Sequence, residues 1–248
     1  MTDSVASDDL AALLRADPPA AAARLRQRAE SGDTGAQRLY AQMLCEGRGI
    51  ARDPQLGLHW YTVAATAGDA QAMNMVGRCH DTGYGTPADP ALAALWYRKA
   101  ADTGLDWGMY NLANLLATGR GVAADPQAAW QLYLQAAQLG HAKSMNLVGR
   151  MLEEGCVVPA DPAAALDWYR RSAAAGDFRG QASLASVLLG QGRQEEALHW
   201  LQQAIAHGSP AFLRQLAAQI QASTQPALAA LLPAINARLA TLDPLATG

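Results

Sequence analysis

Glycine recurs at a spacing of thirty-six residues through most of this 248-residue chain. The five glycines are Gly32, Gly68, Gly104, Gly140 and Gly176. An Asp-Pro step keeps the same spacing, and a tyrosine follows it in register: Asp53-Pro54 with Tyr61, Asp89-Pro90 with Tyr97, Asp125-Pro126 with Tyr133, and Asp161-Pro162 with Tyr169. Self-similarity at a fixed period of this length is typical of repeat architectures. The chain is therefore predicted to be an array of one supersecondary unit.

Each copy is predicted to form a pair of helices. In the second copy, an apolar-periodic run from Ala72 to His80 ends at the breaker sequence of residues 81–85. Asp89 is placed to act as N-cap of the next helix, and Pro90 suits its first position, where the missing N–H would be unpaired anyway. That helix is expected to stop at Gly104, because glycine tolerates the left-handed conformation after a helix end.

Large side chains repeat in the second helix of each copy, and they are interpreted as core. They are Trp60-Tyr61, Trp96-Tyr97, Leu132-Tyr133, Trp168-Tyr169 and Trp200-Leu201, with small partners at Ala93, Ala129, Ala165 and Ala197. A binding ladder of aromatics is the alternative, but a repeat cannot bury its own apolar face and needs large side chains at each contact with its neighbour. The same interpretation covers the first-helix residues Tyr40, Val76, Leu112, Val148 and Leu184.

These patterns resemble the Sel-one-like repeat (SLR) family, whose repeats are relatives of the tetratricopeptide repeats. The residues that carry the resemblance in the second copy are Ala72…Val76-Gly77, Gly83, Gly85, Asp89 and Ala93…Trp96-Tyr97…Ala100-Ala101…Gly104. The resemblance covers about Gly32 to Gly208 and implies an all-α fold, a right-handed α-solenoid (superhelix) of antiparallel helix pairs. The fourth copy departs at Cys156-Val157, where the second glycine is absent. The fifth is four residues short and lacks the Asp-Pro step.

The expected domain organisation is five repeats between two helical caps. The repeats are 32–67, 68–103, 104–139, 140–175 and 176–207, and the caps are 1–31 and 208–248. An apolar stretch from Leu10 to Leu14 and a helix from Pro18 to Ser31 are expected in the first cap. Helices Pro210 to Ala222 and Pro226 to Ala240 are expected in the second, with a kink at Pro233 and fraying towards Gly248. An exposed apolar face over Leu228 to Leu239 is a candidate for pairing with a second copy.

Composition limits the classes of partner. The net charge of −3 argues against general nucleic-acid binding, which favours a basic stripe. Polar residues interrupt every apolar stretch well before the length of a membrane span, and the acidic N-terminus is unlike a secretory signal. A cytoplasmic protein without a membrane or nucleic-acid partner is therefore expected, and the resemblance together with the Ala-rich sequence implies a bacterial one.

No catalytic, metal or cofactor site is predicted. Cys45, Cys79 and Cys156 lie at non-equivalent repeat positions, so reduced thiols are expected, and the hydrolytic and penicillin-binding activities of cysteine-rich relatives are not carried over. The histidines scatter over different repeats without ligand spacing, and His80 is expected to be a buried neutral imidazole. The glycine pairs end helices, so turn chemistry accounts for them better than a phosphate loop.

The candidate binding residues lie on one stripe of the first helices, which are expected to line the concave face. They are Arg38, Gln42, Asn74, Arg78, Trp107, Tyr110, Asn114, Lys143, Asn146 and Arg150. Gln71 and Arg179 share the stripe, a band of carboxylates follows it at Glu46, Asp81, Glu153 and Glu154, and Tyr84 is a weaker candidate. The asparagines are expected to hold a peptide backbone, the arginines carboxylates, and Trp107 an apolar anchor. The alternative is that these side chains only solvate the helices.

The favoured function is a non-enzymatic scaffold or adaptor that binds a protein or peptide partner in the groove. The first alternative is an immunity protein that neutralises a co-encoded bacterial toxin, for which the acidic band would be the contact surface. The second is a hydrolase of cell-wall fragments, which lacks a placed acid/base pair. The partner's identity, the choice between a linear peptide and a folded protein, the oligomeric state and the groove's curvature do not follow from the sequence.

Overall fold

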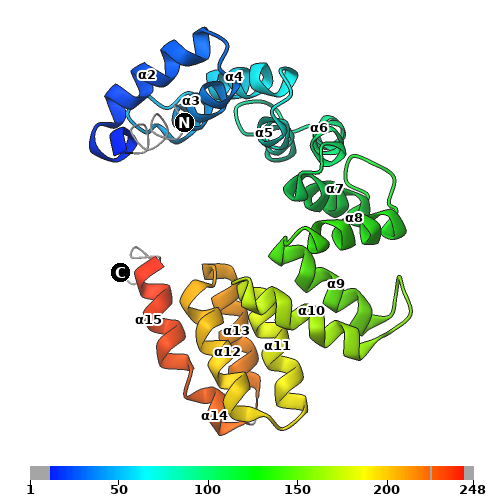
Figure 1. Ribbon diagram of the computed structural model, residues 1–248. Coiled ribbons are helices and arrows are strands. Elements are labelled where there is room, and N and C mark those ends of the chain that lie inside the picture. The colour runs from blue at the N-terminus through cyan, green and yellow to red at the C-terminus, as the bar shows by residue number, and fades with distance from the viewer. Residues whose placement is uncertain (1–11, 224, 243–248) are drawn as a thin grey trace, which may run out of the picture. The chain divides into compact units, whose positions relative to one another are not determined.

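The computed structural model describes residues 12–223 and 225–242. All regular secondary structure in this described part is helical. The chain divides into two compact units, Met1–Leu132 and Tyr133–Gly248, and the division falls within one helix. Figure 1 shows the repeated helix pairs of each unit, which are the pairs that the thirty-six-residue period predicts.

The first unit is a stack of helix pairs. It contains α2 (Pro18–Glu30), α3 (Thr34–Glu46), α4 (Pro54–Thr66), α5 (Ala70–Thr82), α6 (Pro90–Asp102), α7 (Asp106–Thr118) and the first half of α8 (Pro126–Gln138). From α2 to α7, each helix packs against the next one along the chain. Consecutive first helices, α3, α5 and α7, are therefore separated in sequence by one second helix each.

The second unit continues the same arrangement. It contains the rest of α8, then α9 (Ala142–Glu154), α10 (Pro162–Ala174), α11 (Phe178–Gly190), α12 (Gln194–His207), α13 (Pro210–Ala222), α14 (Pro226–Ala229) and α15 (Leu232–Leu242). Helices α9 to α12 pack in sequence, and α15 lies against α12 and α13. In the short fifth copy, α12 begins without an Asp-Pro step, and Arg193 pairs instead with Glu196 in the first turn of the helix.

The N-caps of the second helices follow the sequence prediction. The Asp89 side chain accepts a hydrogen bond from the Leu92 amide at 3.0 Å, Pro90 is the first residue of α6, and Gly104 has a φ of 89° after the helix ends. The other second-helix caps of this type are Asp17, Asp53, Asp125 and Asp161. Replacing such a cap residue by Ala typically costs about 1 kcal/mol of stability.

The first helices are capped too, with one exception. Asp33, Asp69 and Asp177 cap α3, α5 and α11, and the His141 ring accepts the Ser144 amide at the start of α9. At the equivalent position before α7 stands Leu105, which provides no side-chain hydrogen bond. Helix α7 is therefore the one first helix among these that begins without a side-chain cap.

The repeated tyrosines form the core, as predicted. Tyr61, Tyr97, Tyr133 and Tyr169 are buried, as are the alanines and the first-helix residues that were expected to pack with them. The tryptophan of each pair is only partly buried, and Lys99 and Arg171 lie over the rings of Trp96 and Trp168. Each aromatic pair thus has its tyrosine inside and its tryptophan at the edge.

The second cap differs from the prediction of one kinked helix. Helix α14 ends at Ala229 and α15 begins at Leu232, so the chain breaks before Pro233 instead of bending at it. Proline clashes with the carbonyl group four residues earlier, which here belongs to Ala229. The prediction of an exposed apolar face is also wrong, because Leu228, Leu231 and Ile235 are buried against the core of the second unit.

Three smaller predictions concern His80 and the two ends of the chain. His80 is partly exposed instead of buried. Of the first apolar stretch, Leu13 and Leu14 lie in a helical segment and pack against the core around Leu25, whereas Leu10 lies outside the described residues. The predicted fraying near Gly248 also falls outside them.

Candidate functional site

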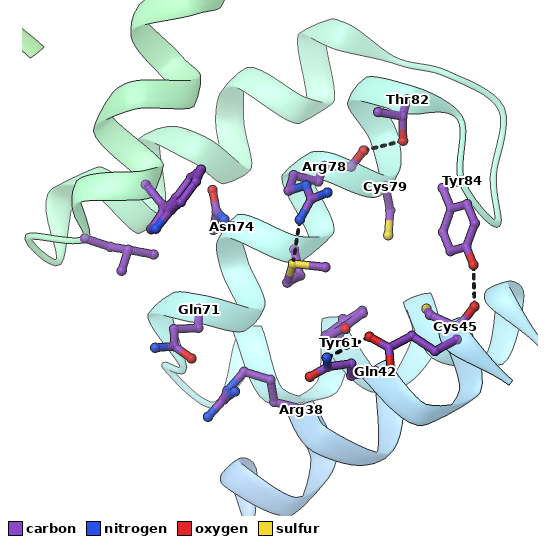
Figure 2. Close-up of a pocket in the computed structure, with 14 residues that line it drawn as sticks. Arg38, Gln42, Cys45, Tyr61, Gln71, Asn74, Arg78, Cys79, Thr82 and Tyr84 are labelled. Atoms are coloured by element: carbon purple, nitrogen blue, oxygen red, sulfur yellow. Dashed lines mark hydrogen bonds between the residues drawn. The ribbon is translucent and has the colours of Figure 1, made fainter. Parts of the chain in front are cut away.

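The first unit contains a pocket of about 640 Å³ between its first helices. Its lining comes from α3, α4, α5, the turn after α5 and the start of α7. The lining residues are Arg38, Gln42, Cys45, Glu46, Tyr61, Gln71, Asn74, Met75, Arg78, Cys79, Thr82, Tyr84, Leu105 and Trp107. Figure 2 shows Arg38 and Gln42 of α3 opposite Asn74 and Arg78 of α5. The pocket therefore follows from the repeat, since successive first helices face each other across it.

Polar contacts between repeats fix the walls of the pocket. Arg38 of α3 pairs with Asp69, the N-cap of α5, at 3.1 Å. Asn111 of α7 donates through its Nδ2 to the Oδ1 of Asn74 on α5 at 2.8 Å. The Tyr84 hydroxyl donates to the Cys45 carbonyl oxygen, with Arg52 beside it, so the turn after α5 is held on α3. These contacts join three consecutive repeats around one space.

The charges in the pocket are not equally neutralised. Arg38 has Asp69 as a partner, and Glu46 accepts a hydrogen bond from Gln42 at 2.7 Å. Arg78 is exposed, and its Nη1 contacts the sulfur of Met75 at 3.6 Å. No carboxylate among the described residues forms an ion pair with Arg78. Its guanidinium is thus available to a ligand.

Trp107 brings an exposed indole to the α7 side of the pocket. Its exposed fraction is 42%, and it meets the Tyr110 ring edge-on at 6.0 Å between centroids. Leu105 and Met75 line the same pocket. The pocket therefore combines these apolar side chains with the charge of Arg78.

The predicted exposure of the asparagine ladder is wrong for two of its three asparagines. Asn74 and Asn146 are only 8% and 6% exposed, and Asn74 serves the contact between α5 and α7. Among the residues at the sixth position after a repeat glycine, these two asparagines are buried, whereas Arg38 and Tyr110 are partly exposed. Of the two asparagines, Asn74 still lines the pocket and is placed to offer its Nδ2 group to a ligand.

The predicted acidic band is largely occupied by contacts within the chain. Arg120 lies 2.6 Å from Asp81, and the Tyr97 hydroxyl lies 3.4 Å from the same carboxylate. Glu153 accepts a hydrogen bond from Tyr169 at 2.7 Å. Two of the four acidic side chains therefore hold core tyrosines. Both carboxylates thus already have partners within the chain.

The pocket brings together half of the predicted binding residues. Arg38, Gln42, Asn74, Arg78 and Trp107 line it. Tyr110 and Asn114 are partly exposed on α7 outside its lining. Lys143, Asn146 and Arg150 belong to the second unit, where Arg150 pairs with Glu154 at 3.3 Å. The binding role of all ten residues stays a prediction.

The sequence did not indicate that Cys45 and Cys79 line the pocket. Cys45 and Cys79 are buried in one core cluster with Tyr61, and all three cysteines are unpaired. Burial raises the pKa of the Cys45 thiol to about 11 and also raises the pKa of Cys79. Both therefore stay protonated near neutral pH and are poor nucleophiles. The sequence shows both cysteines, but it does not show that Cys45 and Cys79 lie in the same core cluster.

The described residues show neither a metal-binding cluster nor a membrane-spanning helix. They contain no group of three or more His, Cys, Asp or Glu side chains placed to hold a metal ion. Among the described helices, none combines the length and apolar character needed to cross a membrane.

Comparison with known families gives one match along most of the chain. The family model of the Sel1 repeat matches residues 34–69, 70–105, 108–141, 142–177 and 180–209. No curated protein is significantly similar in sequence.

Several solved structures share the fold. A Sel1 repeat protein from Oxalobacter formigenes is 26% identical with a TM-score of 0.78, and the match covers 96% of this chain and 98% of that one. The protein c5321, a protective antigen of uropathogenic Escherichia coli with an SLR fold, is 28% identical with a TM-score of 0.70, over 91% of this chain and 49% of that one. This chain thus spans about half of the E. coli protein. The immunity protein Pa5087 of Pseudomonas aeruginosa shares the fold at 18% identity, with a TM-score of 0.60, over 86% of this chain and 83% of that one.

Proposed function

Because this chain belongs to the Sel1-repeat family, whose fold generally serves as a non-catalytic scaffold for protein interactions, we propose that it is a non-enzymatic adaptor. It binds a protein or peptide partner in the pocket between α3, α5 and α7. The observation that carries the proposal is the presence of exposed Trp107 and Arg78 in one pocket. Tryptophan and arginine are enriched among the residues that dominate binding energy at protein interfaces.

The pocket suits binding better than catalysis. Its described lining contains one carboxylate, Glu46, and no histidine, whereas acid/base chemistry at a substrate usually needs a pair of titratable groups. Its two thiols are held protonated by burial. Its polar groups, the Arg78 guanidinium and the Asn74 amide, are donors suited to carboxylates and peptide carbonyl groups.

An immunity protein is the second candidate function. It is favoured by the shared fold with two immunity proteins of Pseudomonas aeruginosa, Pa5087 and PA5088, at 18% and 16% identity. The acidic band offers it little support, since Asp81 and Glu153 are engaged within the chain. Under this candidate the pocket binds a folded toxin. A toxin gene beside the gene for this protein would favour it over the adaptor.

Site-specific photo-crosslinking tests the position of the binding surface. A benzophenone amino acid replaces Gln71, which is exposed in the pocket lining, or Arg98, which is exposed on α6 of the same unit. In the native cell, irradiation is expected to join a distinct partner to the position-71 variant and not to the position-98 variant. The reverse pattern, or one band shared by both variants, would place the interaction outside the pocket.

A further inference from the structure

The start of α7 lacks the side-chain N-cap that the first helices α3, α5, α9 and α11 have. Asp33, Asp69 and Asp177 accept backbone hydrogen bonds at the N-caps of their helices, and His141 does so with its ring nitrogen. Leu105 occupies the same repeat position and caps nothing. Departures from local sequence rules are expected at functional sites, where another requirement outweighs stability.

The departure places an apolar side chain in the pocket. Leu105 is partly exposed and lines the pocket together with Trp107, two residues later. The intervening Asp106 accepts a hydrogen bond from the Trp107 amide at 2.7 Å. An aspartate at position 105 would cap the helix but would put a carboxylate beside the indole. The leucine keeps this side of the pocket apolar.

The charge of Arg78 in the same pocket indicates an anionic group in the ligand. Arg78 has no carboxylate partner among the described residues, whereas Arg38 is neutralised by Asp69. Glu46, the carboxylate of the lining, is on α3 and accepts a hydrogen bond from Gln42 of the same helix. A ligand that buries an apolar group against α7 therefore meets an unneutralised guanidinium on α5. Complementary charge favours an acidic side chain there.

From these observations we infer that the pocket recognises a partner segment with a large apolar side chain next to an acidic residue. The apolar side chain packs against Leu105, Trp107 and Met75, and the acidic residue pairs with Arg78. Leu105 is the residue that sets the apolar preference. This inference rests on the proposed function of the same pocket and specifies the chemistry of its partner.

Selection from a library of random twelve-residue peptides tests the inference. The bait is the full chain carrying the benzophenone amino acid at position 71, so that only peptides crosslinked there are counted. The wild-type pocket is expected to enrich a Leu, Ile, Phe or Trp adjacent to Asp or Glu. Arg78→Ala is expected to remove the acidic preference and keep the apolar one.

Leu105→Asp provides the sharpest variant, because its effects on binding and stability are expected to differ in sign. Binding of the enriched peptides should weaken at least tenfold, while the melting temperature stays equal or rises as the new cap forms. Leu105→Ser, a neutral capping residue, should also weaken binding and excludes simple charge repulsion as the cause. A lower melting temperature in both variants, or unchanged peptide affinity, would overturn the role of Leu105.

The outcomes separate this inference from the function on which it rests. Peptides that crosslink at position 71 without an apolar-acidic pair would overturn the inference and leave the pocket as the binding site. Failure of any peptide to crosslink there, together with failure of position 71 to capture a cellular partner, would overturn both.

Discussion

Replacement of Tyr97 by Ala is expected to lower the free energy of unfolding of the first unit by about 3–5 kcal/mol, as for other large aromatic residues in cores. The ring is 1% exposed and lies so close to α5 that a β-carbon on Gly77 would come within 2.6 Å of it. Truncation leaves a cavity between α5 and α6 that backbone shifts cannot fill without disturbing both helices of this repeat. Urea denaturation followed by circular dichroism measures the loss.

Tyr97→Phe is the matched control for this prediction. It keeps the ring and removes the hydroxyl, whose contact with Asp81 is long at 3.4 Å and whose partner carboxylate also has Arg120. A cost below about 1.5 kcal/mol is expected for the loss of one such hydrogen bond. Equal destabilisation by the two variants would mean that the hydroxyl, not ring packing, is what joins the helices.

Gly85→Ala is expected to destabilise the first unit more than an ordinary glycine replacement does. Gly85 has a φ of 73°, and an added β-carbon would lie 2.4 Å from the Pro54 carbonyl oxygen in the preceding repeat. The left-handed conformation alone costs about 1–2 kcal/mol for a residue with a side chain. The overlap with backbone adds about 1–3 kcal/mol, because neither segment moves freely. Thermal unfolding should show the sum.

Gly104→Ala separates the two contributions. Gly104 has a φ of 89°, but an added β-carbon would have no other atom within 4 Å. This control should cost only the conformational part. Gly49 and Gly121 approach Pro18 and Pro90 in the same way as Gly85 approaches Pro54. If Gly85→Ala and Gly104→Ala were equally destabilising, the turn would not depend on this close approach between repeats.

The repeat pattern predicts the helices and the core because both follow from local and periodic signals. Asp89, Pro90 and Gly104 mark the ends of a helix by their own chemistry, and a tyrosine recurs at the position of Tyr97, which packs against the preceding helix α5. The break before Pro233 was harder to place. The ring's clash affects the chain four residues earlier, and the sequence does not show whether a helix bends there or ends.

The candidate site was only partly predictable from the sequence. The helical period shows which residues share one face of a helix, but it does not show how that face is turned relative to the neighbouring helices. Asn74 and Arg78 lie four residues apart on the predicted stripe, yet one is buried against α7 and the other is exposed. The partners of Asp81 and Glu153 come from other helices and are invisible in one helix's pattern. Leu105 was detectable in the sequence, because the other repeats have a capping Asp or His at the same position.

The most direct test of partner binding in this pocket compares two double variants of the first unit. Arg78→Ala with Trp107→Ala removes the pocket's exposed cation and aromatic ring. Arg98→Ala with Leu95→Ala removes an exposed cation and an exposed apolar side chain from α6, where Leu95 is 59% exposed. Each variant is checked for unchanged helicity and used as bait in native lysate beside the wild type, with quantitative mass spectrometry.

We predict that one partner is at least about tenfold depleted with the pocket variant, as expected for loss of interface residues that dominate affinity, and that its recovery is unchanged with the α6 variant. Equal recovery of every partner with the pocket variant and the wild type would contradict the account, as would an equal loss with both variants.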